Sequence, residues 1–481
     1  MSTPPGKTLE KWPPLGLLYI ASNIRENRSD KVVVLDAFCE GLSRQQLVER
    51  IVKEKPDVIG LNCSTHTFLE AIQALQEAKK ALPNSKIVLG GYHATFASER
   101  ILAEYGFVDY IIKGEAEHAM VQLLERLENG NSLEDVTGIS YRHAGKTINN
   151  PLSLVSELDA LPFPDRGLLS SIDYGYSFQG IPLTFGKFTT LSTSRGCPFR
   201  CTYCSCAAFS LRKWRPRSAE NVIEELETVQ EQGYKNCVIV DDNFTHNPKR
   251  TEDICNLILE RKIDMQFYCE GRVDGASYEL MRKMKRAGIN VIYFGAESAD
   301  ERVLDYYKKH INPEKTRIAI ANAKRAGMLV VTSFIIGAPV ETKDAVQRTL
   351  DFIRSTRPHA VQVNVLDCLI GTSIYEELEK NNVLGEDDWK RNHRIYEYYK
   401  NGFGKDELEA FVSEAYANWF KGWWSKEGIA DILRILGKNK TARRIVFSNL
   451  LNPTVRGLIF KGEKVFDPPK EQGKMETNPG P

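Results

Sequence analysis

The sequence predicts an α/β protein with three parts: an N-terminal doubly wound parallel sheet, a central partial (β/α)6 barrel and a C-terminal helical region. Short runs of β-branched residues alternate with amphipathic helical patterns over residues 13–130, and the alternation resumes near residue 187. Such alternation is typical of parallel sheets covered by helices. From about residue 385 the pattern becomes mostly helical and aromatic. A length of 481 residues leaves room for two to three domains of ordinary size.

Each element of the first sheet follows from a local pattern. Helical patterns cover 15–26, 43–55, 68–81 and 116–127, and Ser43 is placed to cap the second of these helices. Strand patterns cover 32–35, 58–61, 86–89 and 110–112, and the third strand ends in Gly90-Gly91. Ligands of doubly wound sheets bind beyond the carboxyl ends of the strands, so we expect site residues directly after these runs.

The barrel prediction rests on six strand patterns, expected over 191–194, 237–240, 266–269, 290–294, 329–335 and 360–366. A helix over 218–232 follows the first of them, and functional groups of such barrels lie at the C-terminal strand ends. We expect domains at 1–130, 186–384 and 385–466, joined by a connector rich in Pro, Gly and Asp at 131–185. A polar, Pro-rich tail at 467–481 is expected to be disordered.

The overall charge gives no indication of a nucleic-acid partner. Lys and Arg number 64 against 63 Asp and Glu, which is a formal net charge of +1. The ten cysteines form no dense framework of the secreted type, which favours a reducing cytoplasm. The N-terminus lacks the apolar core of a signal peptide, and no stretch reaches the roughly 18 apolar residues that a membrane span needs.

Cys197, Cys201 and Cys204 form a C-x3-C-x2-C motif directly after the first predicted barrel strand. Three thiolates this close in sequence can hold three corners of a cubane [4Fe-4S] cluster and leave one iron open to bind and reduce a substrate. The alternative is a zinc site with Cys206 as fourth ligand, although the paired C-x2-C knuckles usual for structural zinc are absent. Four further cysteines are expected to be buried as small hydrophobes, namely Cys206, Cys237, Cys255 and Cys269.

The motif, with Arg195-Gly196 before its first cysteine, resembles the cluster loop of the radical S-adenosylmethionine (SAM) superfamily. In that superfamily the amino and carboxylate groups of SAM occupy the open iron. The N-terminal sheet resembles the cobalamin-binding half of the radical SAM enzymes that include methylases of unactivated carbon and the anaerobic cyclase of magnesium-protoporphyrin monomethyl ester. The resemblance covers roughly residues 13–375 and implies three cofactors: a [4Fe-4S] cluster, SAM and cobalamin.

For cobalamin, the resemblance points to residues after each strand of the first sheet. Many such domains carry D-x-H-x-x-G with the His on cobalt, whereas this chain keeps the spacing with Phe38, which cannot ligate a metal. His66 is either a lower-face cobalt ligand or a hydrogen-bonding loop residue. Glycines let the backbone approach the nucleotide tail, and small hydroxyl residues bond to it. The implied cofactor-binding residues are Asp36, Phe38, Gly41, Ser64, Thr65, Gly90, Gly91, His93, Thr95, Gly114 and Glu115.

The family's cobalamin-binding sheet also has a strand before its first helix. The segment that precedes Pro13 in this chain is short and polar, so either the start site is misplaced or the sheet is one strand short.

For SAM, the resemblance implicates polar residues at successive barrel strand ends. Asp241-Asp242 would approach the amino group, Arg272 the carboxylate and Glu297 the ribose hydroxyls. The pair Asp241-Asp242 could instead bind a metal, but the sequence offers no evident third ligand. A Gly-x-Pro-x-Glu-Thr turn from Gly337 to Thr342 would lie near adenine, with Glu341 as a contact or as part of the cap of the next helix. Three further candidates on or after the last strand are Gln362, Asn364 and the thiol of Cys368.

The resemblance implies a C-methyltransferase that acts on an unactivated carbon under anaerobic conditions. In the family, the reduced cluster cleaves SAM to methionine and a 5′-deoxyadenosyl radical, this radical removes a hydrogen atom, and methylcobalamin supplies the methyl group. Two alternatives stay open: a radical SAM oxidative cyclase or rearrangement enzyme, and a non-catalytic cobalamin or redox sensor. The expected partners are a small-molecule, lipid or peptide substrate and a one-electron donor such as flavodoxin or ferredoxin.

Aromatic and basic residues gather near the C-terminus. The aromatic residues are Tyr416, Trp419, Phe420, Trp423 and Trp424, and residues 421–464 hold ten Lys and Arg against three Asp and Glu. The favoured interpretation is a helical cap on the barrel with a solvated basic face. The alternative is a peripheral membrane contact of a cytoplasmic protein.

Overall fold

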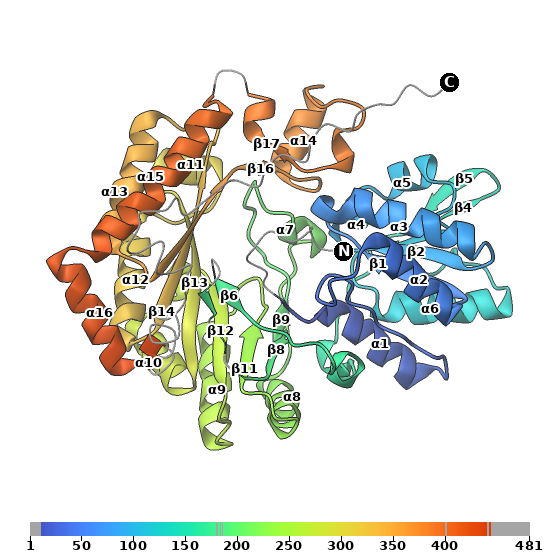
Figure 1. The fold of residues 1–481 in the computed structure, drawn as a ribbon, viewed down its shortest axis with the longest axis horizontal. Helices are drawn as coiled ribbons and strands as arrows, with labels where there is room; N and C mark the ends of the chain where they lie inside the picture. Colours follow the sequence, from blue (N-terminus) through green and yellow to red (C-terminus); the bar gives the residue numbers. More distant parts are fainter. Residues whose placement is uncertain are drawn as a thin grey trace.

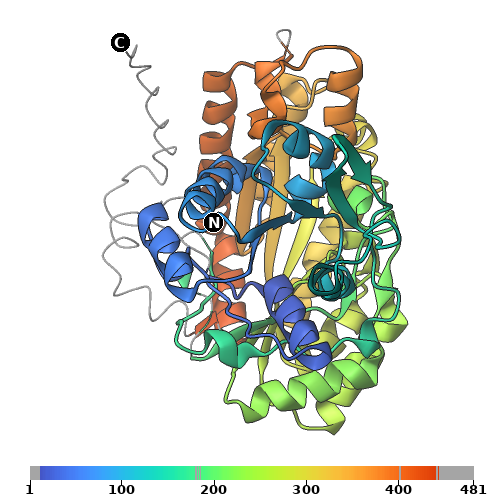
Figure 2. The same cartoon turned by 90° about the vertical axis from the view of Figure 1, so that its right-hand side faces the viewer.

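The structure is a computed structural model that describes residues 11–178, 181–182, 184, 186–399, 402–439 and 442–443. It confirms the predicted α/β architecture, with the N-terminal sheet on one side of the molecule and the barrel on the other (Figure 1). Seen from the N-terminal side, the small sheet lies in front of the barrel strands (Figure 2). The tail expected at 467–481 lies outside the described residues.

The N-terminal sheet has the strand order β1-β2-β3-β4-β5. Its parallel strands are β1 (Val58–Asn62), β2 (Lys86–Gly90) and β3 (Tyr110–Ile112), and the antiparallel strands β4 (Ile139–His143) and β5 (Lys146–Asn149) extend it. Its helices are α1 (Leu15–Asn27), α2 (Arg44–Glu54), α3 (Phe68–Ala81), α4 (Tyr92–Phe96), α5 (Ser98–Glu104) and α6 (Glu117–Asn129). Ser43 caps α2 as predicted, because its side chain accepts from Gln46 N.

Two separate cores form on the faces of this sheet. On one face Ile87 and Leu89 of β2 pack with Phe68 of α3. On the other face Val88 packs with Leu123 of α6. The helices therefore cover both faces, which leaves the strand ends as the place where polar loops gather.

The strand predicted over residues 32–35 is wrong, because the structure has extended backbone there without a sheet ladder. A strand is defined by a neighbour that shares its backbone hydrogen bonds. β1 is the edge strand of the described sheet, and residues 32–35 do not pair with its free edge. Val33 is 44% exposed, as expected for a β-branched residue that lacks a covering layer.

The hairpin of β4 and β5 lies inside the segment that we interpreted as a connector. Ala144 and Gly145 form its two-residue turn with φ of 47° and 76°. Two successive positive φ values match the turn that best joins twisted antiparallel strands, where Asn-Gly or Asp-Gly is the usual sequence. Ala-Gly is a weaker signal, which explains why the hairpin was not predicted.

The barrel confirms the six predicted strands in one parallel sheet of order β15-β14-β13-β12-β11-β8. The strands are β8 (Phe188–Leu191), β11 (Asn236–Ile239), β12 (Gln266–Gly271), β13 (Ile289–Glu297), β14 (Leu329–Ile336) and β15 (Ala360–Val365). The helices between and after them are α8 (Ala219–Glu231), α9 (Pro248–Glu260), α10 (Tyr278–Arg286), α11 (Glu301–Tyr306), α12 (Pro313–Ala326) and α13 (Lys343–Thr356). Short elements beside the barrel are β6 (Ser177–Phe178), β7 (Ile181–Pro182), β9 (Ser194–Arg195), β10 (Arg215–Pro216) and α7 (Cys206–Phe209).

The first barrel strand was predicted three residues too late. Leu191, expected to begin the strand, pairs with Ile239 and ends it. The chain leaves the sheet at Ser192 because the next residue, Thr193, is bonded to the Asp241 carboxylate instead of to a strand. The hydrophobic pattern of the sequence cannot predict that a distant carboxylate will bond to the backbone and end the strand.

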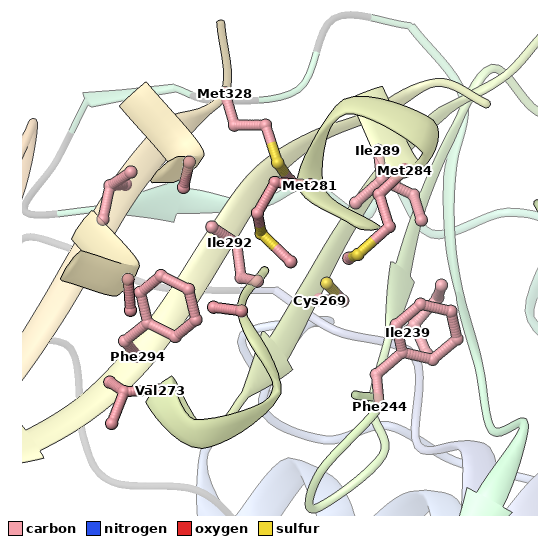
Figure 3. Packing of buried hydrophobic residues seen from close by; sticks show 14 of the residues in the cluster. Ile239, Phe244, Cys269, Val273, Met281, Met284, Ile289, Ile292, Phe294 and Met328 are labelled. Carbon is pink, nitrogen blue, oxygen red and sulfur yellow. The ribbon is translucent and has the colours of Figure 1, made fainter. Parts of the chain in front are cut away.

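The largest core lies between the barrel strands and their helices. Figure 3 shows Cys269 and Phe294 of the strands facing Met281 and Met284 of α10, with Met328 beside them. Cys237, Cys255 and Cys269 are at most 2% exposed and behave as small hydrophobes, as predicted. Cys206 departs from that prediction, because it is partly exposed beside the cysteine loop.

The C-terminal helices confirm the cap interpretation within the described residues. After the short elements β16 (Asp367–Cys368), α14 (Ser373–Lys380) and β17 (His393–Arg394), helices α15 (Lys405–Trp423) and α16 (Lys426–Lys438) follow. The indole N–H groups of Trp419 and Trp423 both donate to Pro358 O, at 2.8 and 3.0 Å, which attaches α15 to the barrel. Among the helices that the structure describes, none has the length and apolar character needed to cross a bilayer.

Candidate functional site

The cysteine loop begins where β8 ends, and two neighbouring aspartates fix its start. Buried Asp241, directly after β11, accepts from Thr193 N at 2.6 Å and from the hydroxyls of Thr193 and Ser194 at 2.5 and 2.6 Å. Asp242 accepts from Gly196 N at 3.0 Å. Both carboxylates therefore act on the backbone that leads into Cys197. The sequence placed them at this strand end, and the role expected of them toward SAM stays a prediction.

Gly196 is required by the path of this loop. Its φ is +84°, and a Cβ there would collide with the carbonyl of Lys213 and the side chain of Ser210. Ser210 Oγ accepts from Cys197 N at 3.4 Å, so the glycine brings the first cysteine against the segment that follows α7.

Cys197, Cys201 and Cys204 are all partly exposed, so none of the three is sealed inside the core. Burial is still enough to raise the pKa of the Cys197 thiol to about 11. A thiolate at such a position needs the positive charge of a metal, which cluster iron supplies. Three partly exposed cysteines on one short loop fit a [4Fe-4S] group.

The cationic side chain of Arg272 lies against the cysteine loop. The Arg272 guanidinium carbon lies 3.7 Å from the ring centroid of Phe199 in the loop, and Arg272 Nη2 donates to Lys309 O at 2.8 Å. Arg272 also forms an ion pair of 3.0 Å with Asp274. The positive charge of Arg272 acts to lower the pKa of the Cys201 thiol, and the resemblance implies that this arginine meets the SAM carboxylate.

Glu297, predicted to accept from ribose hydroxyls, is bonded to protein groups. Its Oε1 lies 2.8 Å from Lys309 Nζ and accepts from the Tyr203 hydroxyl at 2.9 Å, and Oε2 lies 3.4 Å from Ser333 Oγ. Burial alone would lower the pKa of Lys309, but the ion pair with Glu297 raises it, so the pair is ionic. Glu297 also has φ of +62°, an uncommon backbone for this residue type. Lys309 and Tyr203 were not singled out from the sequence.

Cys206 contacts the third cysteine of the motif. A hydrogen bond from Cys206 lowers the pKa of the Cys204 thiol, and the Tyr92 hydroxyl donates to Cys206 Sγ at 3.8 Å. Among the described residues, no three His, Cys, Asp or Glu side chains converge tightly enough to hold one metal ion. A [4Fe-4S] cluster binds each cysteine through a separate iron, so its ligands need not converge on one ion.

The loop with the D-x-F-x-x-G spacing forms a tight turn at the edge of the N-terminal sheet. Asp36 Oδ1 accepts from Cys39 N at 3.1 Å, and Oδ2 accepts from the Tyr174 hydroxyl at 3.0 Å. Gly41 closes the turn with φ of +68°. Phe38 is half-buried in this turn, and it provides no metal ligand there.

The next loop combines exposed and buried polar residues. Ser64 and His66 are exposed, whereas Thr65 is buried and its hydroxyl lies 3.2 Å from Nδ1 of His93. His93 is fully buried against Phe68, its Nε2 has no hydrogen-bond partner, and burial lowers its pKa to about 3. His93 is therefore a neutral packing residue, while Ser64 and His66 remain available to a ligand.

The glycine turn after β2 is rigidly built. Gly91 has φ of +96°, and a Cβ there would lie 2.5 Å from Cys63 O. Thr95 Oγ1 donates to Gly91 O at 2.8 Å and accepts from Gly114 N at 3.0 Å. Gly90 lies at the end of β2 beside this turn. The exposed Ser64 and His66 side chains, together with glycines that keep the backbone bare, fit the nucleotide tail of cobalamin.

Glu115 contacts arginines from the barrel domain. Both of its oxygens lie 2.7 Å from the Arg215 guanidinium nitrogens, and Oε2 also accepts from Val155 N at 2.7 Å. These bonds use both oxygens of the carboxylate. In the structure Glu115 therefore connects the N-terminal domain to the barrel. Its predicted contact with a cofactor stays a prediction.

At the fifth strand end, Glu341 folds back onto its own turn. Its Oε2 accepts from Gly337 N at 2.6 Å, and buried Oε1 has no hydrogen-bond partner. Burial raises the pKa of Glu341 to about 7. Thr342 caps α13 through Ala345 N. Cys368 is 1% exposed, which argues against a reactive thiol.

Polar residues of β13 and β15 lie on the inner side of the barrel. The Tyr293 hydroxyl donates to Gln362 Oε1 at 2.9 Å, and Gln362 Nε2 donates to Asn364 Oδ1 at 3.4 Å. Below them the interior is closed by an apolar cluster that includes Phe188 and Tyr268, with Trp12, Tyr174 and Tyr176 packed against it. The inner side thus has an apolar floor and a polar upper layer.

Two sequence profiles match this chain. The B12 binding domain matches residues 6–124, and the Radical SAM superfamily matches residues 191–353. The protein called uncharacterized methyltransferase PH0819 from Pyrococcus horikoshii is 33% identical over 85% of this chain and 88% of its own length. The anaerobic magnesium-protoporphyrin IX monomethyl ester cyclase of Rubrivivax gelatinosus is 29% identical over 72% of this chain and 63% of its own length.

Two solved structures share the fold of most of the chain. The cobalamin-dependent SAM radical enzyme OxsB with aqua-cobalamin bound gives a TM-score of 0.69 at 19% identity, over 90% of this chain and 78% of that one. The radical SAM methyltransferase TsrM from Kitasatospora setae, with cobalamin and a [4Fe-4S] cluster bound, gives 0.65 at 17% identity, over 78% of this chain and 76% of that one.

Proposed function

Since this chain belongs to the cobalamin-dependent radical SAM enzymes, we propose that it transfers a methyl group to an unactivated carbon of a polar small molecule. When bound, the three cofactors supply one-electron cleavage of SAM and a transferable methyl group. The chain's own residues hold these groups, orient them and exclude water from the reacting centre. The residues after β1 and β2 would hold cobalamin, and the loop after β8 would hold the cluster.

One contact carries this proposal. Tyr92, directly after the Gly90-Gly91 turn, stacks on Phe209 of α7 with ring centroids 4.2 Å apart, and its hydroxyl reaches Cys206. The turn proposed for cobalamin therefore touches the loop proposed for the cluster. Transfer of a methyl group to a carbon activated at the cluster requires both groups at one place, and this contact provides it.

The polar layer inside the barrel supports a substrate that forms hydrogen bonds. Tyr293, Gln362 and Asn364 offer hydroxyl and amide groups, and Glu270, two residues after the inward Tyr268, is exposed. Although Tyr293, Gln362 and Asn364 bond to one another, a lipid chain packed on them would desolvate their remaining donors and acceptors, at a cost of about 1–3 kcal/mol for each one left unsatisfied. We therefore favour a polar small molecule over a lipid or a tetrapyrrole.

A low-potential protein such as flavodoxin or ferredoxin would supply the electron, and the enzyme would act in the cytoplasm. Phe420 and Trp424 are the exposed aromatic residues in the described part of α15 and its end, at 42% and 63%. Two such side chains would make a weak membrane contact at most, because their aromatic neighbours pack on the barrel.

The deciding experiment supplies methyl-labelled SAM to the full chain, loaded with its cluster and cobalamin, under anaerobic reducing conditions. The measurement is which products form and where the labelled methyl group is found. We expect 5′-deoxyadenosine and S-adenosylhomocysteine together, and label on cobalamin before a substrate is added. The variant with Ala in place of Cys197, Cys201 and Cys204 should form no 5′-deoxyadenosine. Formation of 5′-deoxyadenosine without S-adenosylhomocysteine or label transfer would favour the cyclase alternative, and absence of both products would favour a sensor.

A further inference from the structure

We propose that Glu115 and Glu117 of the cobalamin-binding domain are positioning residues for the cluster loop, and that they act through Arg195 and Arg215. The four side chains join the end of β3 and the start of α6 to the two-stranded ribbon of β9 and β10. We call this group the Arg–Glu clamp. It does not depend on which carbon is methylated.

The clamp is built from short, directed contacts. Arg195 Nη2 lies 2.8 Å from Glu117 Oε1, and Arg195 Nη1 lies 3.6 Å from Glu115 Oε2. Arg215 forms a bidentate pair with Glu115 at 2.7 Å for both bonds. Arg195 and Arg215 are directly paired across β9 and β10, so both guanidinium groups come from one ribbon. Bidentate pairs fix distance and orientation together, which loose apolar packing does not.

These charges are largely removed from water. The exposed fractions of the side chains are 16% for Arg195, 11% for Arg215, 9% for Glu115 and 4% for Glu117. Two positive and two negative groups balance within the clamp, and the Arg195 guanidinium also lies 4.8 Å from the ring centroid of Tyr19. Loss of one partner would leave a buried charge unpaired, so the clamp is expected to break as a unit.

The clamp links the two cofactor loops by a continuous path. At one end, Thr95 bonds to both Gly91 O and Gly114 N, and Gly114 directly precedes Glu115. At the other end, Arg195 directly precedes Gly196 and the first cysteine, Cys197. A displacement of the glycine turn is thereby transmitted to the backbone of the cysteine loop. This is the physical basis for a positioning role.

The first test is hydrogen exchange of peptides covering residues 193–204 in the cluster-loaded full chain. In Glu117→Gln we expect about tenfold faster exchange there, which corresponds to loss of a charged hydrogen bond. Glu128→Gln is the matched control on the same helix, because Glu128 pairs with Arg28 at 2.9 Å but is 67% exposed. The control should exchange like the unaltered protein.

The second test measures whether the cluster and cobalamin are held at a fixed distance and orientation. With reduced cluster and cob(II)alamin both bound, the clamp predicts a defined magnetic interaction in the EPR spectrum of cob(II)alamin. Glu117→Gln should weaken or broaden this interaction while iron content and cobalamin content stay those of the control. Arg195→Lys is a milder variant that can be used if Glu117→Gln fails to fold, because lysine keeps the positive charge but lacks the planar guanidinium. It should also weaken the magnetic interaction and speed exchange over residues 193–204.

Unchanged exchange over 193–204 and an unchanged EPR interaction in both variants would overturn the proposal. The exchange experiment needs neither cobalamin nor substrate, so its result is independent of whether the proposed methylation is correct. A uniform loss of protection over the whole chain would also count against the proposal, because it would indicate a general stabilising role.

Discussion

Tyr203 donates a hydrogen bond of 2.9 Å to Glu297, which joins the cysteine loop to the end of β13 across 94 residues of sequence. Lys309 completes the contact, since its Nζ lies 2.8 Å from Glu297 Oε1 and 3.1 Å from the Tyr203 hydroxyl. Tyr203 stands between Cys201 and Cys204. The position of two of the predicted cluster cysteines is therefore tied to a buried ion pair of the barrel.

Removing Lys309 should destabilise the protein strongly. In Lys309→Met the Glu297 carboxylate is left buried without its cation, and an isolated buried charge of this kind costs about 3–5 kcal/mol. The measurement is anaerobic unfolding in denaturant of the cluster-loaded chain. The double variant Lys309→Met/Glu297→Gln should lose less than the sum of the single variants, by about 1–3 kcal/mol. Strict additivity of the two changes would show that the pair is not coupled.

Cys206 should be dispensable for the cluster, although it neighbours Cys204. The expected ligands are Cys197, Cys201 and Cys204, so Cys204→Ala should lose most of its bound iron while Cys206→Ala keeps it. The measurement is iron and sulfide content per chain, together with the cluster absorbance, after anaerobic reconstitution. Equal iron loss in both variants would return Cys206 to the ligand set and revive the four-thiol alternative.

The parts of the site that the sequence predicted are those encoded within a few residues. The cysteine spacing is local, and the aspartates after β11 were placed correctly because strand ends can be read from hydrophobic pattern. What Asp241 bonds to was not predictable, because its partners Thr193 and Ser194 belong to another strand. No local pattern indicated the ion pairs that Lys309 and Glu117 form, since a charged residue in a loop or at the start of a helix is normally solvated.

In the fold, too, elements encoded by a local pattern were predicted and elements that depend on distant partners were not. The six barrel strands were predicted because parallel strands buried on both faces are continuous apolar runs. Residues 32–35 have such a run and are not a strand, because strand formation depends on a neighbour that no local pattern reports. The hairpin turn at Ala144-Gly145 was missed for the opposite reason, since its backbone is that of an Asn-Gly turn while its sequence is not.

The glycine turn after β2 offers a matched pair of substitutions. Gly91→Ala should destabilise the N-terminal sheet by about 1–3 kcal/mol, because φ is +96° and the new Cβ would collide with the backbone of Cys63. Gly90→Ala is the control, since its Cβ would meet Ile112 O at an ordinary 3.7 Å. We expect this loss of stability in the first variant only, and the measurement is the unfolding free energy of both variants. Equal stability of the two variants would contradict a backbone requirement at Gly91.

Glu341 should make stability depend on pH between about 4.5 and 7. Burial raises its pKa in the folded state from 4.5 to about 7, so in this window the folded chain binds more protons at this group than the unfolded chain. The contribution to the unfolding free energy is therefore fully present below pH 4.5 and is lost as the pH rises through 7. The full difference is about 3 kcal/mol.

Glu341→Gln isolates this contribution, because the amide keeps an oxygen for Gly337 N and cannot ionise. The measurement is the unfolding free energy of both proteins from pH 5 to pH 8 at constant ionic strength. The difference between them should grow with pH, with the variant relatively more stable at pH 8, since all other titrating groups are shared. Parallel curves would mean that Glu341 ionises normally in the folded chain, which would require water to reach its Oε1.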